Sequence, residues 1–164
     1  MSGCFTSKKL STESIPVVKD FAIKRYTGTW YEIARLPHSF EKNLEKVTAT
    51  YTLQRDGKIE VLNKGFDLEK GKWKEIQGKA WIPDSSVPAC LKVRFFLFFS
   101  SDYRVIDLDS ENYSYAMVTS SSRKYLWILS RAPQIDESLY KHLVQKAQDL
   151  GFSVEKLIRV RHSQ

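Results

Sequence analysis

Side chains that commonly catalyse reactions or bind metals are few in this sequence and far apart. Its three histidines, His38, His142 and His162, have none of the spacings typical of a metal site. Cys90 alternates with basic residues, so its thiol is predicted to face outward, away from any pocket. Glu32 is predicted to be buried, and buried carboxyls more often satisfy local hydrogen bonds than act as general bases. Since no nucleophile and base come together, we expect no catalysis, no metal and no cofactor.

The composition narrows the class of protein. The chain has 164 residues, enough to bury a single core, and its 26 basic and 19 acidic residues give a formal net charge of +7. That charge permits nucleic acid, anionic lipid or a solvated basic surface, and the solvated surface is the favoured interpretation. The sequence has no RNP-like aromatic motif and no zinc-finger spacing, so nucleic acid is not an expected partner. No apolar run reaches the length of a membrane span.

The elements that must position the remaining side chains are strands with one buried face. Val47, Ala49 and Tyr51 share one side of such a strand, and the threonines between them share the other. We expect eight strands, at residues 29–35, 47–53, 59–64, 75–82, 90–95, 104–109, 113–119 and 125–131. Their even spacing predicts an all-β fold, an antiparallel barrel or sandwich. The facing of the strands at 104–109 and 113–119 stays open.

One segment near the end of the chain has the period of a helix. Apolar residues recur at helical spacing over 139–150, after Asp136 as a predicted N-cap and before Gly151 as a terminator. Such a helix needs a partner for its apolar stripe, and we expect it to pack outside the sheet. A short final strand at 157–160 is expected to lie beside the first strand.

Gly28 and Trp30 open the first strand, and Arg131 closes the eighth. A glycine before a large aromatic side chain indicates a tight turn that places the indole in a closed space. An arginine can cover that indole through a cation–π contact. We interpret Gly28, Trp30 and Arg131 as structural residues that close one end of the barrel, helped by a short helical turn just before Gly28.

The first twenty residues carry Ser, Thr, Lys and Pro with little periodicity, which predicts an N-terminal tether ahead of one domain at residues 21–164. The opening residues 1–4 resemble the end of a bacterial lipoprotein signal, in which Cys4 would become lipidated. Only three residues precede Cys4, too few for a complete signal. A truncated signal and an unmodified cysteine therefore both remain open.

Three stretches, residues 24–35, 40–51 and 125–131, resemble the lipocalin family and are similar in particular to its bacterial lipoproteins. The resemblance extends over about residues 17–160 and implies an eight-stranded up-and-down barrel with a ligand cavity. It implies lysophospholipids or fatty acids as the ligand class and a possible homodimer. It also implies pocket positions at Tyr51, Asn63, Phe95 and Trp127.

Strand alternation predicts which side chains line the interior of this barrel. Most of them are apolar or small, as in a lipid pocket rather than an active site. The predicted lining is Ala34, Ala49, Tyr51, Val61, Asn63, Ala80, Leu91, Val93, Phe95, Arg104, Trp127 and Leu129. Arg104 is the exception, because one choice of strand facing puts it inside near the mouth, where it could bind a carboxylate or phosphate, and the other puts it on the surface.

If Trp30 marks the closed end, the loops after the first, third, fifth and seventh strands surround the open end, the mouth. These loops carry aromatic residues that would form an apolar rim, namely Phe40, Phe66, Phe96, Phe98 and Phe99. Basic residues lie beside them, namely Lys42, Lys46, Lys70, Lys72, Arg123 and Lys124. The combination suits an amphiphile with an anionic head, although the phenylalanines could also fold inward as a lid.

These observations predict a non-enzymatic protein that binds, stores or transports a lipid or amphiphile of the lysophospholipid or fatty acid class. If Cys4 is a lipoprotein cysteine, the expected place of this protein is the periplasmic face of a bacterial outer membrane, where it would be lipid-anchored and help to maintain the envelope. Otherwise we expect a soluble or peripheral protein. Two alternatives remain from the sequence. One is an enzyme of the same fold that acts on a bound lipid, and the other is an interaction module whose mouth binds a protein.

Overall fold

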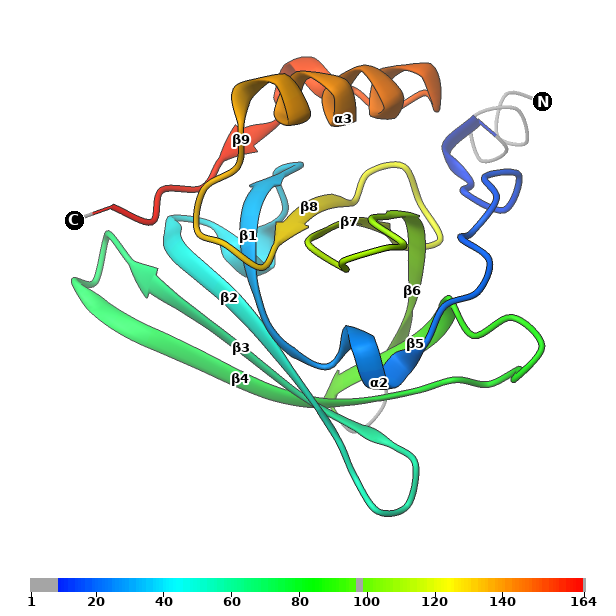
Figure 1. Cartoon of the computed structure of the whole chain (residues 1–164). Helices are drawn as coiled ribbons and strands as arrows, with labels where there is room; N and C mark the ends of the chain where they lie inside the picture. Colours follow the sequence, from blue (N-terminus) through cyan, green and yellow to red (C-terminus); the bar gives the residue numbers. More distant parts are fainter. Residues whose placement is uncertain (1–8, 97–98, 164) are drawn as a thin grey trace, which may run out of the picture.

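The computed structural model describes residues 9–96 and 99–163, which form a closed antiparallel barrel (Figure 1). Strand β1 pairs with both β2 and β8, and this double pairing closes the ring. The predicted all-β barrel is confirmed. The barrel strands are β1 (Gly28–Arg35), β2 (Leu44–Leu53), β3 (Ile59–Asp67), β4 (Lys72–Trp81), β5 (Cys90–Phe96), β6 (Phe99–Leu108), β7 (Tyr115–Thr119) and β8 (Leu126–Ser130).

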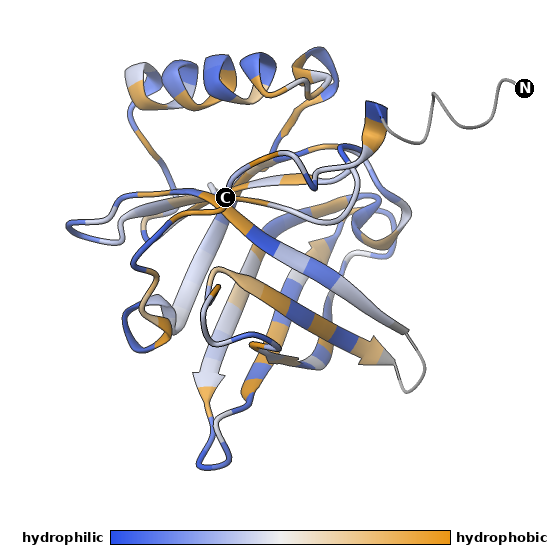
Figure 2. Cartoon of the chain, turned by 90° about the vertical axis from the view of Figure 1, so that its right-hand side faces the viewer, coloured by the Kyte–Doolittle hydropathy of each residue, from blue (hydrophilic) through white to orange (hydrophobic). Residues whose placement is uncertain are grey.

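The alternating pattern places one face of each strand inside the barrel. Orange and blue segments alternate along the barrel strands in Figure 2, as the period of two requires. Tyr51, Val61 and Val93 belong to a buried cluster inside the ring. A second buried cluster, which includes Ile128 and Met117, lies on the outer side of the same strands.

Helix α3 (Glu137–Asp149) covers this second cluster from outside (Figure 1). Leu143 and Ala147 are buried between the helix and the sheet. Asp136 precedes the helix, and Gly151 follows it with φ +91°, a backbone conformation that favours glycine. The predicted helix is therefore confirmed. The short strand β9 (Ile158–Arg159) pairs with β1, also as predicted.

A one-residue irregularity in β1 moves Ala34 out of the cavity. Glu32 pairs with Leu129, which faces inward, whereas Ala34 pairs with Ile128 of the outer cluster. The register shifts between Glu32 and Ala34, so the alternation of faces is interrupted there. Ala34 was predicted to line the pocket, and that prediction is wrong.

The segment before the barrel, as far as it is described, does not hang free like the predicted tether. Ile15 is buried in the outer cluster, and the Val18 N–H donates to the Val105 carbonyl at 3.0 Å. Thr12 Oγ1 donates to the Ser120 carbonyl, and Ser11 forms a bridge with Ser122. Residues 11–18 are held because apolar side chains in this stretch bury against the barrel. Within the described residues, no helix has the length and apolarity to cross a membrane.

A candidate ligand-binding cavity

The interior of the barrel contains a cavity of about 610 Å³. Its walls come from the inward side chains of the strands and from two loops, residues 36–43 after β1 and 120–125 after β7. These loops lie at the end of the barrel opposite Trp30, and with the β3–β4 turn at 68–71 they form the mouth. The volume lies within the range of pockets that hold small ligands, roughly 300–1,000 Å³.

The closed end is built around Trp30, whose side chain is fully buried. Arg131 lies over the indole, with its guanidinium carbon 3.9 Å from the ring centroid. Arg131 Nη2 donates to the backbone carbonyls of Arg25 (2.9 Å) and Thr27 (2.9 Å). Gly28 has φ +102°, and a Cβ there would lie 3.1 Å from Arg131 Nη1. The structure thus places these residues in the arrangement expected of a structural closure.

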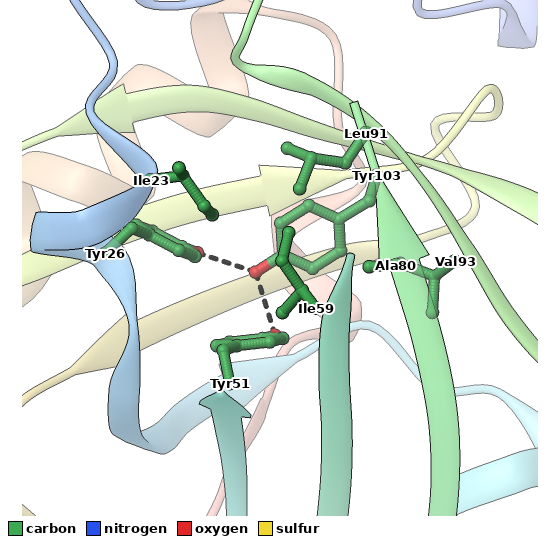
Figure 3. A pocket seen from close by; sticks show the side chains of 8 residues that line it. All are labelled: Ile23, Tyr26, Tyr51, Ile59, Ala80, Leu91, Val93 and Tyr103. Carbon is green, nitrogen blue, oxygen red and sulfur yellow. Dashed lines mark hydrogen bonds between the residues drawn. The ribbon is translucent and has the colours of Figure 1, made fainter. Parts of the chain in front are cut away.

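The floor of the cavity is a cluster of three tyrosines, shown in Figure 3. Tyr103 Oη lies 2.6 Å from Tyr26 Oη and 2.9 Å from Tyr51 Oη. Tyr26 comes from α2 (Ile23–Tyr26), which occupies the closed end of the barrel. Burial is the largest cause that raises the pKa of each of the three phenols, so all three are neutral at physiological pH.

Asn63 lies on the inward face of β3, in the wall of the cavity. Its Oδ1 atom is buried and has no hydrogen-bond partner among the described residues. Asn63 pairs with Ala49, and the neighbouring inward pair joins Tyr51 to Val61. Because these pairs are adjacent on one face of the sheet, Asn63 lies one step from Tyr51 towards the mouth.

A buried polar network lies in the wall near the mouth. Glu41 Oε2 accepts a hydrogen bond from Trp127 Nε1 (3.1 Å) and lies 2.6 Å from His38 Nε2. Arg35 Nη1 donates to Glu32 Oε1 (3.1 Å), and Arg35 Nη2 donates to the Glu41 carbonyl (2.8 Å). The irregularity in β1 that turns Ala34 outward also brings Arg35 to the inner face beside Glu32.

The pKa values of the two carboxyls in this network are shifted in opposite directions. Burial and the nearby Glu41 charge raise the pKa of Glu32 well above its ordinary value. Burial also opposes ionisation of Glu41, but hydrogen bonds from His38 and Glu32 outweigh it and lower the pKa of Glu41. The Arg35 guanidinium contacts both carboxyls, with Nη1 3.1 Å from Glu32 Oε1 and Nε 3.8 Å from Glu41 Oε2. Sequence reasoning missed Glu41 as a cavity residue, although the spacing of His38 and Glu41 by three residues in one loop was a usable signal.

The structure brings most of the predicted pocket residues together. Those in the wall of the large cavity are Ala49, Tyr51, Val61, Asn63, Val93, Phe95, Trp127 and Leu129. Ala80 and Leu91 lie below them, around a second cavity of about 10 Å³ beneath the tyrosines. Two predicted residues line neither cavity, namely Ala34, as described above, and Arg104.

Arg104 faces the outside of the barrel. It pairs with Cys90, whereas the inward Leu91 pairs with Tyr103, so Tyr103 occupies the inner face at that level. Arg104 Nη2 donates to the Ile15 carbonyl at 2.8 Å, which holds the N-terminal segment. Val105 and Leu108 both belong to the inner cluster, although they are three residues apart, because the register shifts between Val105 and Asp107. Strict alternation counted back from Leu108 therefore gives the wrong facing for Arg104. The option of Arg104 as an internal anion ligand is therefore wrong.

The apolar side chains at the mouth are partly as predicted. Phe40 is 71% exposed at the rim. Phe66 instead lies on the outer wall, where it packs edge-to-face against Trp73 at 5.5 Å between ring centroids. Leu68 (55% exposed) and Trp73 (49% exposed) extend this apolar surface on the β3–β4 hairpin. Cys4 and Phe98 lie outside the described residues, as do the side chains of Phe96 and Phe99.

The basic residues around the mouth are not all available to a partner. Lys46 and Lys64 lie over the rings of Phe66 and Trp73, with Nζ 5.8 Å and 5.0 Å from the ring centroids. Arg123, in contrast, donates to the Leu150 carbonyl (2.8 Å) and to the Ser11 carbonyl. Arg123 therefore fastens the mouth loop to the helix and the N-terminal segment.

Groups suited to catalysis or metal binding are sparse in the part of the chain that the structure describes. No cluster of three or more His, Cys, Asp or Glu side chains there could hold a metal ion. Cys90 is a free, partly exposed thiol on the outer face, beside Arg104. His142 lies on the exposed side of α3, and His162 Nε2 lies 2.7 Å from the Glu32 carbonyl.

Comparison with known proteins gives a consistent result. A family model described as "Lipocalin-like domain" matches residues 21–162. The chain is 46% identical over 149 residues to "Outer membrane lipoprotein Blc" of Vibrio cholerae, covering 91% of this chain and 87% of that protein. It is 48% identical over 147 residues to the protein of the same name from Escherichia coli K12, covering 90% of this chain and 82% of that one.

The solved structure of insecticyanin from the tobacco hornworm Manduca sexta superposes with a TM-score of 0.75. That alignment covers 92% of this chain and 86% of insecticyanin, at 21% sequence identity. At this identity the likeness concerns the fold alone.

Proposed function

The chain belongs to the lipocalin family, whose members bind small hydrophobic ligands, and on this premise we propose that it binds and carries a lipid or amphiphile without transforming it. The ligand class we propose is lysophospholipids or fatty acids. The observation that carries the proposal is the cavity of about 610 Å³, whose wall is largely apolar and which reaches the mouth. An apolar chain transferred from water into such a space gains about 0.8 kcal/mol for each buried CH₂ group.

The side chains at the mouth support the proposal that ligand is exchanged at a membrane surface. Phe40, Leu68 and Trp73 expose apolar surface at this end, and lysines lie beside the aromatic rings. Aromatic and basic side chains together are typical of surfaces that contact anionic lipid. We place this surface at the bacterial outer membrane, because the relatives named Blc are outer membrane lipoproteins.

The course of the N-terminal segment supports a lipid anchor at Cys4. Ser11 and Thr12 contact the loop at 120–125, which is part of the mouth. A lipid on Cys4 would be joined to the chain seven residues before Ser11, which contacts this mouth loop. Mass spectrometry of the protein from a membrane fraction tests this, since a diacylated Cys4 and an unmodified Cys4 differ by the mass of the lipid.

An enzyme of the same fold is the second candidate, and one observation favours it. His38 and Glu41 lie 2.6 Å apart in the cavity wall, an arrangement also found in general bases. Against it, the structure gives His38 Nδ1 no hydrogen-bond partner among the described residues, so no nucleophile is paired with the imidazole there. Turnover of a lipid by the purified protein, abolished by Glu41→Gln, Glu32→Gln or Cys90→Ser, would support an enzyme.

The experiment that tests the carrier is native mass spectrometry combined with lipid extraction. The protein should retain a lipid from its host or bind added lysophospholipid or fatty acid at one equivalent per chain, and the same spectra give the oligomeric state. Ala49→Phe places a ring in the cavity and should reduce binding at least tenfold. Thr48→Phe is the matched control, because Thr48 faces outward on the same strand. Protein that neither retains nor binds any lipid would contradict the proposal, and it would leave a protein-interaction module as the better reading.

A further inference from the structure

The hydroxyl groups of the three floor tyrosines leave one hydrogen unused. Tyr26, Tyr51 and Tyr103 have one O–H each, and only two contacts join them, at 2.6 Å and 2.9 Å. Each contact uses one hydrogen. None of the three hydroxyls has another hydrogen-bond partner among the described residues. Whichever way the chain of hydrogen bonds runs, one O–H therefore remains to be given to something else.

Of the two cavities beside the tyrosines, the large one has room for an acceptor of this O–H. The small cavity below the tyrosines holds only about 10 Å³, close to the minimum for one water molecule, and its surface is apolar. Figure 3 shows Ile23, Ile59, Ala80 and Leu91 around it. A buried water needs two to four polar partners, which this space does not offer. Tyr51 and Tyr103, by contrast, also line the large cavity.

Asn63 adds a second unused polar group on the same side of the cavity. Its Oδ1 is buried without a partner, and no hydrogen bond of its side chain joins it to any described residue. A carboxamide can both donate and accept, whichever way the amide is turned. A buried polar group without a partner costs about 1–3 kcal/mol, which a suitable ligand would recover.

The charges around this part of the cavity disfavour an anion. Glu32 and Glu41 lie in the wall above, and they are among the causes that raise the pKa of the Tyr51 phenol. The floor itself, as defined by the residues around the small cavity, contains no basic side chain. Three lysines line the large cavity, and each is paired with a carboxylate. Lys64 and Lys74 are paired with Glu75 and Asp67 on the β3–β4 hairpin, and Lys92 is paired with Asp102 between β5 and β6. An ionised carboxylate at the floor would therefore be buried without a counter-ion.

We propose that Tyr51, Tyr103 and Asn63 form a deep polar subsite that binds an uncharged hydroxyl group on the buried end of the ligand. This inference rests on the proposed function, because it concerns the chain that the cavity encloses. A hydroxyl accepts from the unused tyrosine O–H or donates to the Asn63 carbonyl, whereas a plain methyl end leaves both unsatisfied. The preferred ligand class is thus an amphiphile that carries a hydroxyl far along its hydrocarbon chain.

The test compares saturated fatty acids with their ω-hydroxy counterparts of equal chain length. Both series have the same carboxylate, so the difference reports on the buried end alone. Binding is measured by displacement of a fluorescent fatty acid and checked by quenching of Trp127, which lines the cavity. At the length that reaches the floor, we expect the ω-hydroxy acid to bind about tenfold more tightly, as one or two additional buried hydrogen bonds predict.

Substitutions locate this preference in the structure. Asn63→Leu and the double variant Tyr51→Phe/Tyr103→Phe should each reduce the ratio of the two affinities to about twofold or less, whatever their effect on binding of the plain acid. Tyr26→Phe is the matched control, because Tyr26 does not line the large cavity and its loss leaves one unused O–H on the remaining pair. Thermal unfolding shows which variants are folded.

If the wild-type protein binds the plain acids as tightly as the ω-hydroxy acids at every chain length, this result alone overturns the proposed subsite. A preference that survives in both Asn63→Leu and the tyrosine double variant also overturns it. If neither series binds, the proposed function itself has failed. The two failures are thus distinguishable.

Discussion

The two ends of the barrel are built in opposite ways. At the closed end, Trp30 is fully buried, Arg131 covers its ring, and the guanidinium donates to several backbone carbonyls. At the mouth, Phe40, Leu68 and Trp73 expose apolar surface that nothing in the described chain covers. Buried polar groups with hydrogen-bond partners and dense packing stabilise a single structure, whereas exposed apolar side chains favour contact with a partner molecule. The contrast indicates that stability is concentrated at the closed end and ligand exchange at the mouth.

The strongest test of this contrast is Trp30→Ala. Removing the indole leaves a cavity in the closed end and removes the ring beneath Arg131, so we expect the free energy of unfolding to fall by about 3–5 kcal/mol. Urea denaturation followed by circular dichroism measures the loss. Ligand affinity of the fraction that remains folded should change little. A variant with normal stability and altered affinity would contradict the structural role of Trp30.

A slightly smaller loss of stability is expected from Arg35→Met. This substitution tests whether the buried polar network near the mouth also stabilises the fold. The substitution leaves the Glu41 charge in the wall without its guanidinium, and it removes the donor to the Glu41 carbonyl. Breaking a buried ion pair in this way should lower the free energy of unfolding by about 3 kcal/mol. The double variant Arg35→Met/Glu41→Gln, which removes both charges, should recover part of the loss. Equal stability of wild type and Arg35→Met would show that the network adds no rigidity.

The pH dependence of stability tests the same network, with a smaller expected effect. The pKa of Glu32 is raised by burial, so its neutral form stabilises the fold below the unfolded pKa of 4.5, and this contribution is lost as pH rises through the folded pKa. Glu32→Gln stays neutral at every pH. As pH rises above about 5, the variant should therefore lose less stability than wild type. Parallel stability curves for the two proteins would show that Glu32 is ionised in the fold.

The smallest effect on stability, and a clear one on binding, is expected at the mouth. Phe40→Ser and Trp73→Ser remove exposed side chains and should change the free energy of unfolding by no more than about 0.5 kcal/mol. Each should weaken co-sedimentation with vesicles that contain anionic lipid several-fold. Val87→Ser is the control, because Val87 is also exposed but lies in the loop between β4 and β5 at the closed end. An equal loss of vesicle binding in all three variants would contradict a specific role of the mouth.

Much of this architecture follows from the sequence by itself. Alternation identifies the strands, helical spacing between Asp136 and Gly151 identifies α3, and the pair of Trp30 and Arg131 indicates which end is closed. Alternation also places Tyr51, Val61 and Asn63 correctly on the inner face. These features are local or periodic, so neighbouring residues along the chain are enough to define them.

Near the two register shifts, in β1 and β6, only the tertiary structure decided which side chains face the cavity. One extra residue in β1 turns Ala34 outward and Arg35 inward, and a similar shift in β6 accompanies the outward facing of Arg104. An alternating pattern cannot reveal such a shift, because it depends on pairing with strands distant in sequence. The network of His38, Glu41 and Trp127 and the tyrosine floor arise for the same reason. Their members come from separate strands and loops, and only closure of the barrel brings them together.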